Sequence, residues 1–303
     1  MAVHEIPLER RTLHGHFSRD LPPVVTIDSG DTIAFACLDA SWHVAPDGEK
    51  LEPRDEELDA GHALVGPVEV RGARAGQTLA VRIDAVEPGP FGFTVAGGWA
   101  SPLNDRLGVA QGETRVLRWE LSGGIARDDR GRAVELRPFL GVLGMPPPER
   151  GVHSTVPPRP WGGNLDCAEL VAGTTLYLPV PVDGALLSAG DGHGRQGDGE
   201  VSGTAIECGI AHAELTLSLR DDLPLERPLA RTQDGWIAFG LDEDLDVAAA
   251  QAVDGILAVM AREHGLDRLD ALALASVAVD VRVTQVVNGV CGAHAVLRDN
   301  VLR

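Results

Sequence analysis

The sequence predicts a mainly β protein, with a β-sandwich-based fold and a few α-helices late in the chain. Its 303 residues are enough for a large core, and 36 glycines and 20 prolines without a low-complexity run imply many turns between short strands. Short segments alternate apolar and polar residues, as half-buried antiparallel strands do. Only residues 246–264 and 267–276 space their apolar residues at helical intervals, and Gly265 supplies a stop between them.

The N-terminal half is expected to consist of strands and turns. Residues 24–27 and 32–35 flank a turn and indicate a hairpin. Residues 63–70 and 79–86 alternate as a second antiparallel pair would. Two further strands are expected at 114–121 and 133–140, around a turn at 122–132. Residues 38–61 form an acidic loop to which no chemistry is assigned, and the Gly-rich apolar segment 91–99 is suited to a wall around a small substrate.

Consecutive prolines at 146–148 are the strongest break in the chain. They place a lobe boundary near Pro148, between an N-terminal β-rich lobe (1–148) and a lobe with the Gly-rich site and the C-terminal helices (149–303); one continuous unit is the alternative. Pro179 and Pro181 predict an edge strand at 177–182. Further strands are expected at 201–206, 212–219, 236–240 and 277–287, before a Gly-rich tail that ends near His294.

The net charge of −19 argues against nucleic acid or an anionic membrane as a partner, because phosphate binding needs clustered positive charge. The N-terminus has no apolar signal-peptide region, and no apolar run approaches the roughly 18 residues of a membrane span. The four cysteines are widely spaced and form no C-x-x-C pair. We therefore expect a cytoplasmic protein with reduced thiols.

The only lysine, Lys50, lies in the acidic loop, in what we expect to be a surface turn. Hydrolytic mechanisms that use a Cys-Glu-Lys or Ser-Ser-Lys triad need a lysine held in a pocket. The sequence therefore disfavours a lysine-based mechanism.

Residues 188–207 are too polar for a core strand and too Gly-rich for a helix, and we interpret them as a loop running into a strand. Asp191 and His193 are two residues apart, so in extended backbone both side chains leave on the same side. The surrounding glycines let the chain curl around a small group. Carboxylate and imidazole are good ligands for Zn²⁺ and related divalent ions, so the stretch is a candidate metal site. A solvated Gly/Asp-rich turn is the alternative.

Strand parity separates the two glutamates of this stretch. In an unbroken strand over 200–206, Glu200 and Glu207 point to opposite faces, and both can serve one site only if Gly203 makes a bulge. We therefore rank Glu200 above Glu207. His14 shares a face with His16 and can reach a metal from a distance in sequence, although such a pair more often lines a half-exposed strand.

The motif GDGHGRQGDGEVSGTAIE over 190–207, preceded by PPRP at 157–160 and GGNLD at 162–166, resembles the acetamidase/formamidase family. GHALVGP at 61–67, TQVV at 284–287 and GAHA at 292–295 agree with that family in order, so the likeness covers nearly the whole chain. The resemblance implies an amidohydrolase that cleaves the C–N bond of short linear amides to carboxylate and ammonia. It also implies a homodimer or higher homo-oligomer.

Together with the ligand preferences of divalent ions, the resemblance implies a metal held by Asp166, Asp191 and His193. Glu200 would act first as general base and then as general acid. Asp191 and His193 would then count as catalytic as well. The expected cofactor is a divalent metal, foremost Zn²⁺, with Ca²⁺ or another divalent ion as alternatives. The resemblance suggests that His62 faces the site, while a capping or core role is the alternative. Additional candidates for the site are Gln196, Asp198, Glu207, Asn164 and His14.

Several alternatives stay open at this point. Members of the family often carry histidine before Gly162, where this chain has Trp161; if that histidine belongs to the site, the departure would change substrate size or the pKa values of the site. Cys167 follows Asp166 directly and suggests a competing thiol mechanism. A lactam hydrolase and a non-catalytic, metal-stabilised protein that binds a small polar ligand are the alternative functions.

Overall fold

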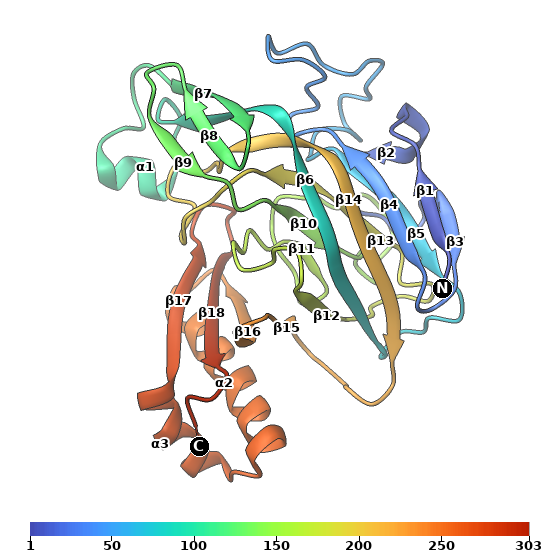
Figure 1. Cartoon of the computed structure of the whole chain (residues 1–303), viewed down its shortest axis with the longest axis vertical. Coiled ribbons are helices and arrows are strands. Elements are labelled where there is room, and N and C mark those ends of the chain that lie inside the picture. Colours follow the sequence, from blue (N-terminus) through green and yellow to red (C-terminus); the bar gives the residue numbers. More distant parts are fainter. Residues whose placement is uncertain (303) are drawn as a thin grey trace.

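The computed structural model describes residues 1–302 and shows a mainly β chain (Figure 1). Eighteen strands, three α-helices and one 3-10 helix follow one another in this order: β1 (Val3–Ile6), η1 (Arg10–Thr12), β2 (Leu13–His14), β3 (Val25–Ile27), β4 (Thr32–Cys37), β5 (Leu64–Val70), β6 (Thr78–Ala96), α1 (Pro102–Leu107), β7 (Arg115–Ser122), β8 (Ile125–Asp128), β9 (Ala133–Glu135), β10 (Phe139–Gly144), β11 (Gly162–Asn164), β12 (Thr175–Pro179), β13 (Leu187–His193), β14 (Glu207–Arg220), β15 (Leu229–Arg231), β16 (Gly235–Asp242), α2 (Leu245–His264), α3 (Arg268–Ala278), β17 (Val279–Gln285) and β18 (Cys291–Arg298). The predicted fold class is confirmed, including the two longer helices late in the chain.

Backbone pairing arranges most strands in two layers. In one layer, the long antiparallel strands β6 and β14 lie side by side (Figure 1). On the β14 side, the layer continues with β4 and β1. On the β6 side, it continues with β12, β15, β16, β18 and β17. The other layer contains β3, β5, β13, β10 and β11. Strands β13 and β14 are paired only at His193 and Glu207. The backbones of the two layers are therefore joined by strand pairing at this one residue pair.

The main core lies between these layers, and a second core lies under the late helices. Buried residues of β4, β6 and β14 pack with those of β5, β10 and β13 in one cluster. Helix α2 buries an alanine-rich face on β16 and β18, and α3 packs against α2 and β17. Asp244 caps the start of α2 and Gly265, with a φ of +66°, ends it, which confirms the predicted stop.

Several predicted strands exist but have other partners than expected. Strands β3 and β4 form no hairpin, because β3 pairs with β5 while β4 pairs with β1 and β14. The Asp31 side chain between them binds the Ala2 amide and the His4 ring, which holds β1 beside β4. Strands β5 and β6 also belong to different layers rather than to one pair. Alternation marks an inward face but does not identify the neighbouring strand.

Five other predictions need correction. Strand β12 is not an edge strand, because it pairs with both β6 and β15; Pro179 is its last residue, where a missing N–H is tolerated. The expected turn at 122–132 contains β8, and the expected tail near His294 contains β18. The first residues of the stretch 188–207 belong to β13, and the chain then continues as a loop. Residues 201–206 form no strand, because Gly203, with a φ of +83°, turns the chain.

Strands on either side of Pro148 are hydrogen-bonded to one another: β10 pairs with β13, and β6 pairs with β14. These pairs cross the lobe boundary predicted near Pro148, and that boundary stays a prediction. No helix within residues 1–302 is long and apolar enough to cross a membrane.

Candidate metal centre and active site

Four buried carboxyl groups surround one buried histidine where the two layers meet. Asp191 and His193 come from the end of β13, and Glu207 opens β14 directly opposite His193. Asp166 follows β11, and Glu200 comes from the loop between β13 and β14. None of the five side chains belongs to a residue more than 7% exposed. The structure thus brings together the predicted metal ligands, the predicted general base and the glutamate that was ranked below it.

The distances within this cluster suit a shared cation. His193 Nε2 lies 3.3 Å from Asp191 Oδ1 and 3.4 Å from Glu207 Oε2. Two sets, Asp166 with Asp191 and His193, and His193 with Glu200 and Glu207, each offer ligand atoms within 4.8 Å of one another. The assumption of an unbroken strand over 200–206 was wrong, because the chain turns at Gly203 and brings Glu200 and Glu207 to the same side.

Three of the four acids have left-handed backbone conformations. The φ angles of Asp166, Asp191 and Glu200 are +48°, +59° and +46°. For residues other than glycine this region costs about 1–2 kcal/mol per residue, although aspartate tolerates it better than most. Such conformations cluster at functional sites, where surrounding structure enforces them. Here they turn three carboxyl groups toward one point, which sequence spacing alone could not reveal.

Gly141 in β10 provides the space for the cluster. A Cβ atom at this position would lie 2.5 Å from Asp191 Oδ2 and 2.7 Å from Asp166 Oδ1. Glycine is therefore required there by the approach of the two carboxyl groups rather than by a turn. The sequence analysis missed this residue, since the run from Phe139 to Gly144 has the pattern of an ordinary buried strand.

We expect Gly141→Ala to fold but to bind metal at least about tenfold more weakly, because the methyl group displaces two proposed ligands. Metal titration and thermal unfolding of the same preparation check this. Gly197→Ala is the matched control, since a Cβ atom there meets nothing within 4 Å. Unchanged metal affinity in Gly141→Ala would contradict this role for the glycine.

Several atoms of the cluster are buried without a hydrogen-bond partner. They are Asp166 Oδ1, Asp191 Oδ1, His193 Nδ1 and Glu207 Oε2. The two contacts of His193 with acids are therefore close but not well-formed hydrogen bonds. Leaving buried carboxyl oxygens unsatisfied is costly unless an ion or protons compensate them. Carboxylate oxygens and an imidazole nitrogen are the donors that divalent ions prefer, so the residues present fit a divalent cation.

The electrostatics of the cluster show the same excess of negative charge. Burial raises the pKa of Asp166 to about 7. The charge of His193 opposes this shift, and the charges of Asp191 and Glu207 add to it. Burial also raises the pKa of Glu200 and Glu207. Burial alone would lower the pKa of His193, but Asp191 and Glu207 raise it well above the usual value. Without a cation, this cluster therefore holds protons at neutral pH.

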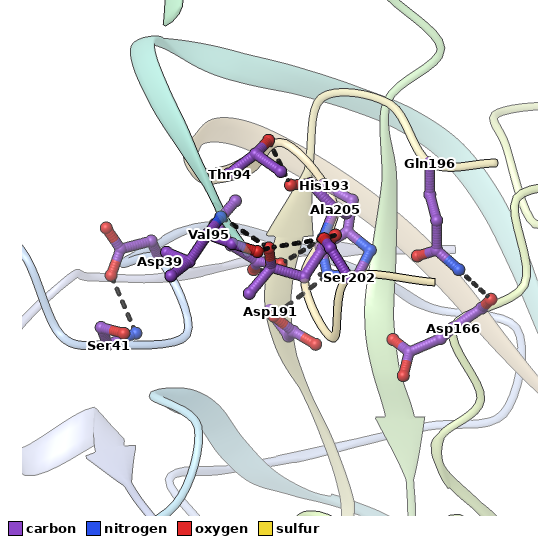
Figure 2. A network of polar contacts seen from close by, with 12 residues as sticks. Asp39, Ser41, Thr94, Val95, Asp166, Asp191, His193, Gln196, Ser202 and Ala205 are labelled. Carbon is purple, nitrogen blue, oxygen red and sulfur yellow. Dashed lines mark hydrogen bonds and ion pairs between the residues drawn. The ribbon is translucent and has the colours of Figure 1, made fainter. Parts of the chain in front are cut away.

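Neighbouring polar groups hold the acids in place. The Asn288 side-chain amide donates to Asp166 Oδ2 at 2.6 Å. The Gln196 side-chain amide donates to the Asp166 carbonyl oxygen at 2.7 Å (Figure 2). Glu207 Oε1 accepts from the Ala205 amide at 2.7 Å, while Thr94 donates to the Ala205 carbonyl oxygen. These contacts hold Asp166 and Glu207 in place. Asn288 was not among the predicted residues.

Two of the other predicted residues line the adjoining cavity. Asn164 donates to the Val156 carbonyl oxygen, and its own Oδ1 has no partner. His62 Nδ1 lies 2.7 Å from Thr155 Oγ1. Asn164 and His62 are thus placed to meet a molecule in this cavity.

The remaining candidates lie outside the two sets of potential ligands. Asp198 is partly exposed, and its carboxylate lies 3.7 Å from Arg282. Gln196 reaches the cluster only through its contact with Asp166. His14 is buried between the His16 carbonyl oxygen and Ser188 Oγ, and it does not line the cavity.

Burial lowers the pKa of His14 to about 4. The unfolded chain therefore binds this proton at a higher pH than the folded chain does, and stability falls as the pH drops from 6.5 toward 4. We expect the wild type to lose about 2 kcal/mol more unfolding free energy than His14→Gln between pH 7 and pH 5. Urea unfolding of both proteins at the two pH values measures this difference, and equal losses would contradict it.

The cluster opens into a cavity of about 450 Å³. Phe93, Val95 and Trp99 line it, which agrees with the predicted apolar wall at 91–99. The acidic loop, to which the sequence analysis assigned no chemistry, also lines the cavity. Lys50 is exposed, as predicted for a surface turn, yet it lines this cavity together with Arg54.

The structure gives no support to a thiol mechanism. Cys167 is fully buried, and burial raises its pKa to about 12, so almost no reactive thiolate exists at neutral pH. Its side chain does not line the cavity. Trp161 likewise packs against the main core and is not part of the cavity wall.

Fold and site define a β-sandwich protein with a buried centre of carboxylates and histidine. The chain belongs to the acetamidase/formamidase family, whose family model matches residues 3–150 and 148–233. It is 27% identical over 256 residues to the acetamidase of Mycolicibacterium smegmatis (65% of this chain, 63% of the relative) and 27% identical over 244 residues to the formamidase of Methylophilus methylotrophus (63% and 60%). The chain thus spans less than two thirds of the length of these relatives.

A solved structure extends the likeness to nearly the whole chain. An acetamidase from Bacillus halodurans superposes with a TM-score of 0.85, at 29% identity, over 97% of both chains. The two proteins therefore share the same overall fold.

Proposed function

We propose that the protein hydrolyses short linear amides, such as formamide and acetamide, to a carboxylate and ammonia with the help of a divalent ion. The buried cluster carries this proposal, because its unpartnered carboxyl and imidazole atoms lie at a cavity of about 450 Å³. That cavity has room for a small amide and a few waters. Membership of the acetamidase/formamidase family supports the same reaction class.

Asp166, Asp191 and His193 would hold the ion, with Glu207 available as a further ligand. The ligand set suits Zn²⁺, and its oxygen-rich character also admits Ca²⁺ or another divalent ion. When bound, such an ion supplies Lewis-acid chemistry, lowering the pKa of water and polarising a carbonyl group.

Glu200 is the residue we assign to proton transfer. Amide nitrogen is a poor leaving group, so hydrolysis needs a base for the attacking water and an acid for the nitrogen. Burial, with the added charge of Asp166, raises the pKa of Glu200 well above its usual value, so the carboxyl group holds a proton readily. Glu200 takes the proton from water as the C–O bond forms. It returns the proton to nitrogen as the C–N bond breaks and ammonia leaves.

The cavity wall would orient the substrate. Asn164 Oδ1 is an unpartnered acceptor on this wall and can accept a hydrogen bond from the amide NH₂ group. Phe93, Val95 and Trp99 cover the acyl group and keep the space small. Discrimination of one methyl group by such a wall is worth about 1–3 kcal/mol, so formamide and acetamide are both expected to react.

Ammonia release from formamide, acetamide and a five-membered lactam tests the proposal. We expect ammonia from the two linear amides. Ring opening of the lactam with no ammonia from linear amides would move the function to lactam hydrolysis. Tight metal binding with no turnover of any amide would favour the non-catalytic alternative. The expected homo-oligomer and the lobe boundary near Pro148 stay predictions.

A further inference from the structure

Two positively charged side chains line the cavity without any ionic partner. Lys50 and Arg54 both belong to the acidic loop, which carries seven carboxylates between Asp47 and Asp59. Within residues 1–302, neither Lys50 nor Arg54 uses its side chain in a hydrogen bond or ion pair. Arg54 Nε is in addition buried and without an acceptor. A buried charged donor without an acceptor costs more than a neutral one, so Arg54 Nε is available to bind an acceptor from the cavity.

The loop around these cations is held in a defined shape. Lys50 forms a backbone bridge with His43, whose ring and amide bind the buried Asp39 carboxylate. The Arg54 guanidinium lies over the Trp42 ring, with 5.6 Å from Cζ to the ring centroid. Trp42 is only 1% exposed and donates from its indole nitrogen to the Gly61 carbonyl oxygen. A stacked guanidinium is pre-organised to bind a carboxylate through two hydrogen bonds.

Two cations on this wall oppose the charge of their surroundings. The chain carries a net charge of −19, and five carboxyl groups, the four of the cluster and that of Asp59, line the same cavity. A field of that sign repels anionic molecules from a cavity unless local positive charge compensates it. The arrangement is therefore suited to a substrate that has an amide at one end and a negative charge at the other.

We propose that Lys50 and Arg54 bind a carboxylate on the substrate, so that the preferred substrates are short primary amides whose acyl chain ends in a carboxylate. This inference rests on the proposed amide hydrolysis. The nitrogen of a primary amide has no substituent, so the second charged group must belong to the acyl side. Water cleaves the C–N bond as before, and the products are ammonia and a dicarboxylate.

Succinamate and its neutral analogue succinamide have nearly the same shape. Comparing their kcat/KM values therefore separates the effect of the substrate's charge from that of its size. We expect kcat/KM for succinamate to exceed that for succinamide by at least about tenfold in the wild type. Lys50→Met and Arg54→Gln should each remove most of this preference by lowering the value for succinamate. Arg74→Gln is the matched control, because Arg74 is exposed and lies outside the cavity.

Binding of succinate, measured by calorimetry, provides a readout that does not depend on turnover. We expect about tenfold weaker binding in Arg54→Gln and unchanged binding in Arg74→Gln. Equal kcat/KM values for the two amides in the wild type, or succinate binding unaffected by Arg54→Gln, would overturn the inference while leaving amide hydrolysis intact. Succinate binding that depends on Arg54, without ammonia release from any amide, would instead refute the proposed reaction and keep the anion site.

Discussion

Asp191→Asn is expected to lose bound metal and turnover together. Asparagine keeps the size of the side chain and tolerates the left-handed backbone at this position, so the fold should survive. Its neutral amide oxygen is a much weaker ligand than a carboxylate. Since Asp191 is one of three proposed ligands, elemental analysis should find little metal, and ammonia release should fall by at least about a thousandfold, as expected when Lewis-acid activation is lost.

Asp198→Asn is the matched control for this experiment. Asp198 lies in the same Gly-rich stretch but is partly exposed and faces Arg282 rather than the cluster. We expect it to retain metal and activity. An Asp191→Asn protein that keeps both its metal and its turnover would contradict the assignment of the metal site.

Glu200→Gln should separate chemistry from metal binding. If Glu200 only transfers protons, the variant keeps its metal while kcat falls by about 10²–10⁴, the usual contribution of a positioned general acid–base group. The KM value should change little, because the glutamine occupies the same space. Steady-state kinetics and metal analysis of one preparation measure both effects.

Glu200 also belongs to the second set of potential ligands, with His193 and Glu207. Loss of metal in Glu200→Gln would therefore make Glu200 a ligand and contradict its assignment as the base. Glu113→Gln, at an exposed position outside the cavity, serves as the control for the substitution itself.

The parts of the fold that depend on local patterns could be predicted from the sequence. The spacing of apolar residues and Gly265 located α2 to within one residue of its observed start. Alternation located most strands, and the separation of Asp191 and His193 by two residues correctly placed both on one side of β13. These features depend on helix and strand periodicity, that is, on which residues close together in the sequence share a face.

The features that depend on long-range contacts could not be predicted in this way. Strand partners were wrong for β3 and β5 because an alternating strand fits either layer of a sandwich equally well. Glu207 was undervalued because the turn at Gly203 changes which side the chain faces. The close approach of Gly141 to two acids leaves no local signal, since that contact joins β10 to residues far along the chain.

Metal content and chelator-sensitive ammonia release, measured on the same tag-free protein, test the central claim most directly. We expect at least one divalent ion per chain, loss of ammonia release from acetamide or formamide on chelation, and recovery when that ion is restored. Steady ammonia release from protein that contains no metal would contradict it.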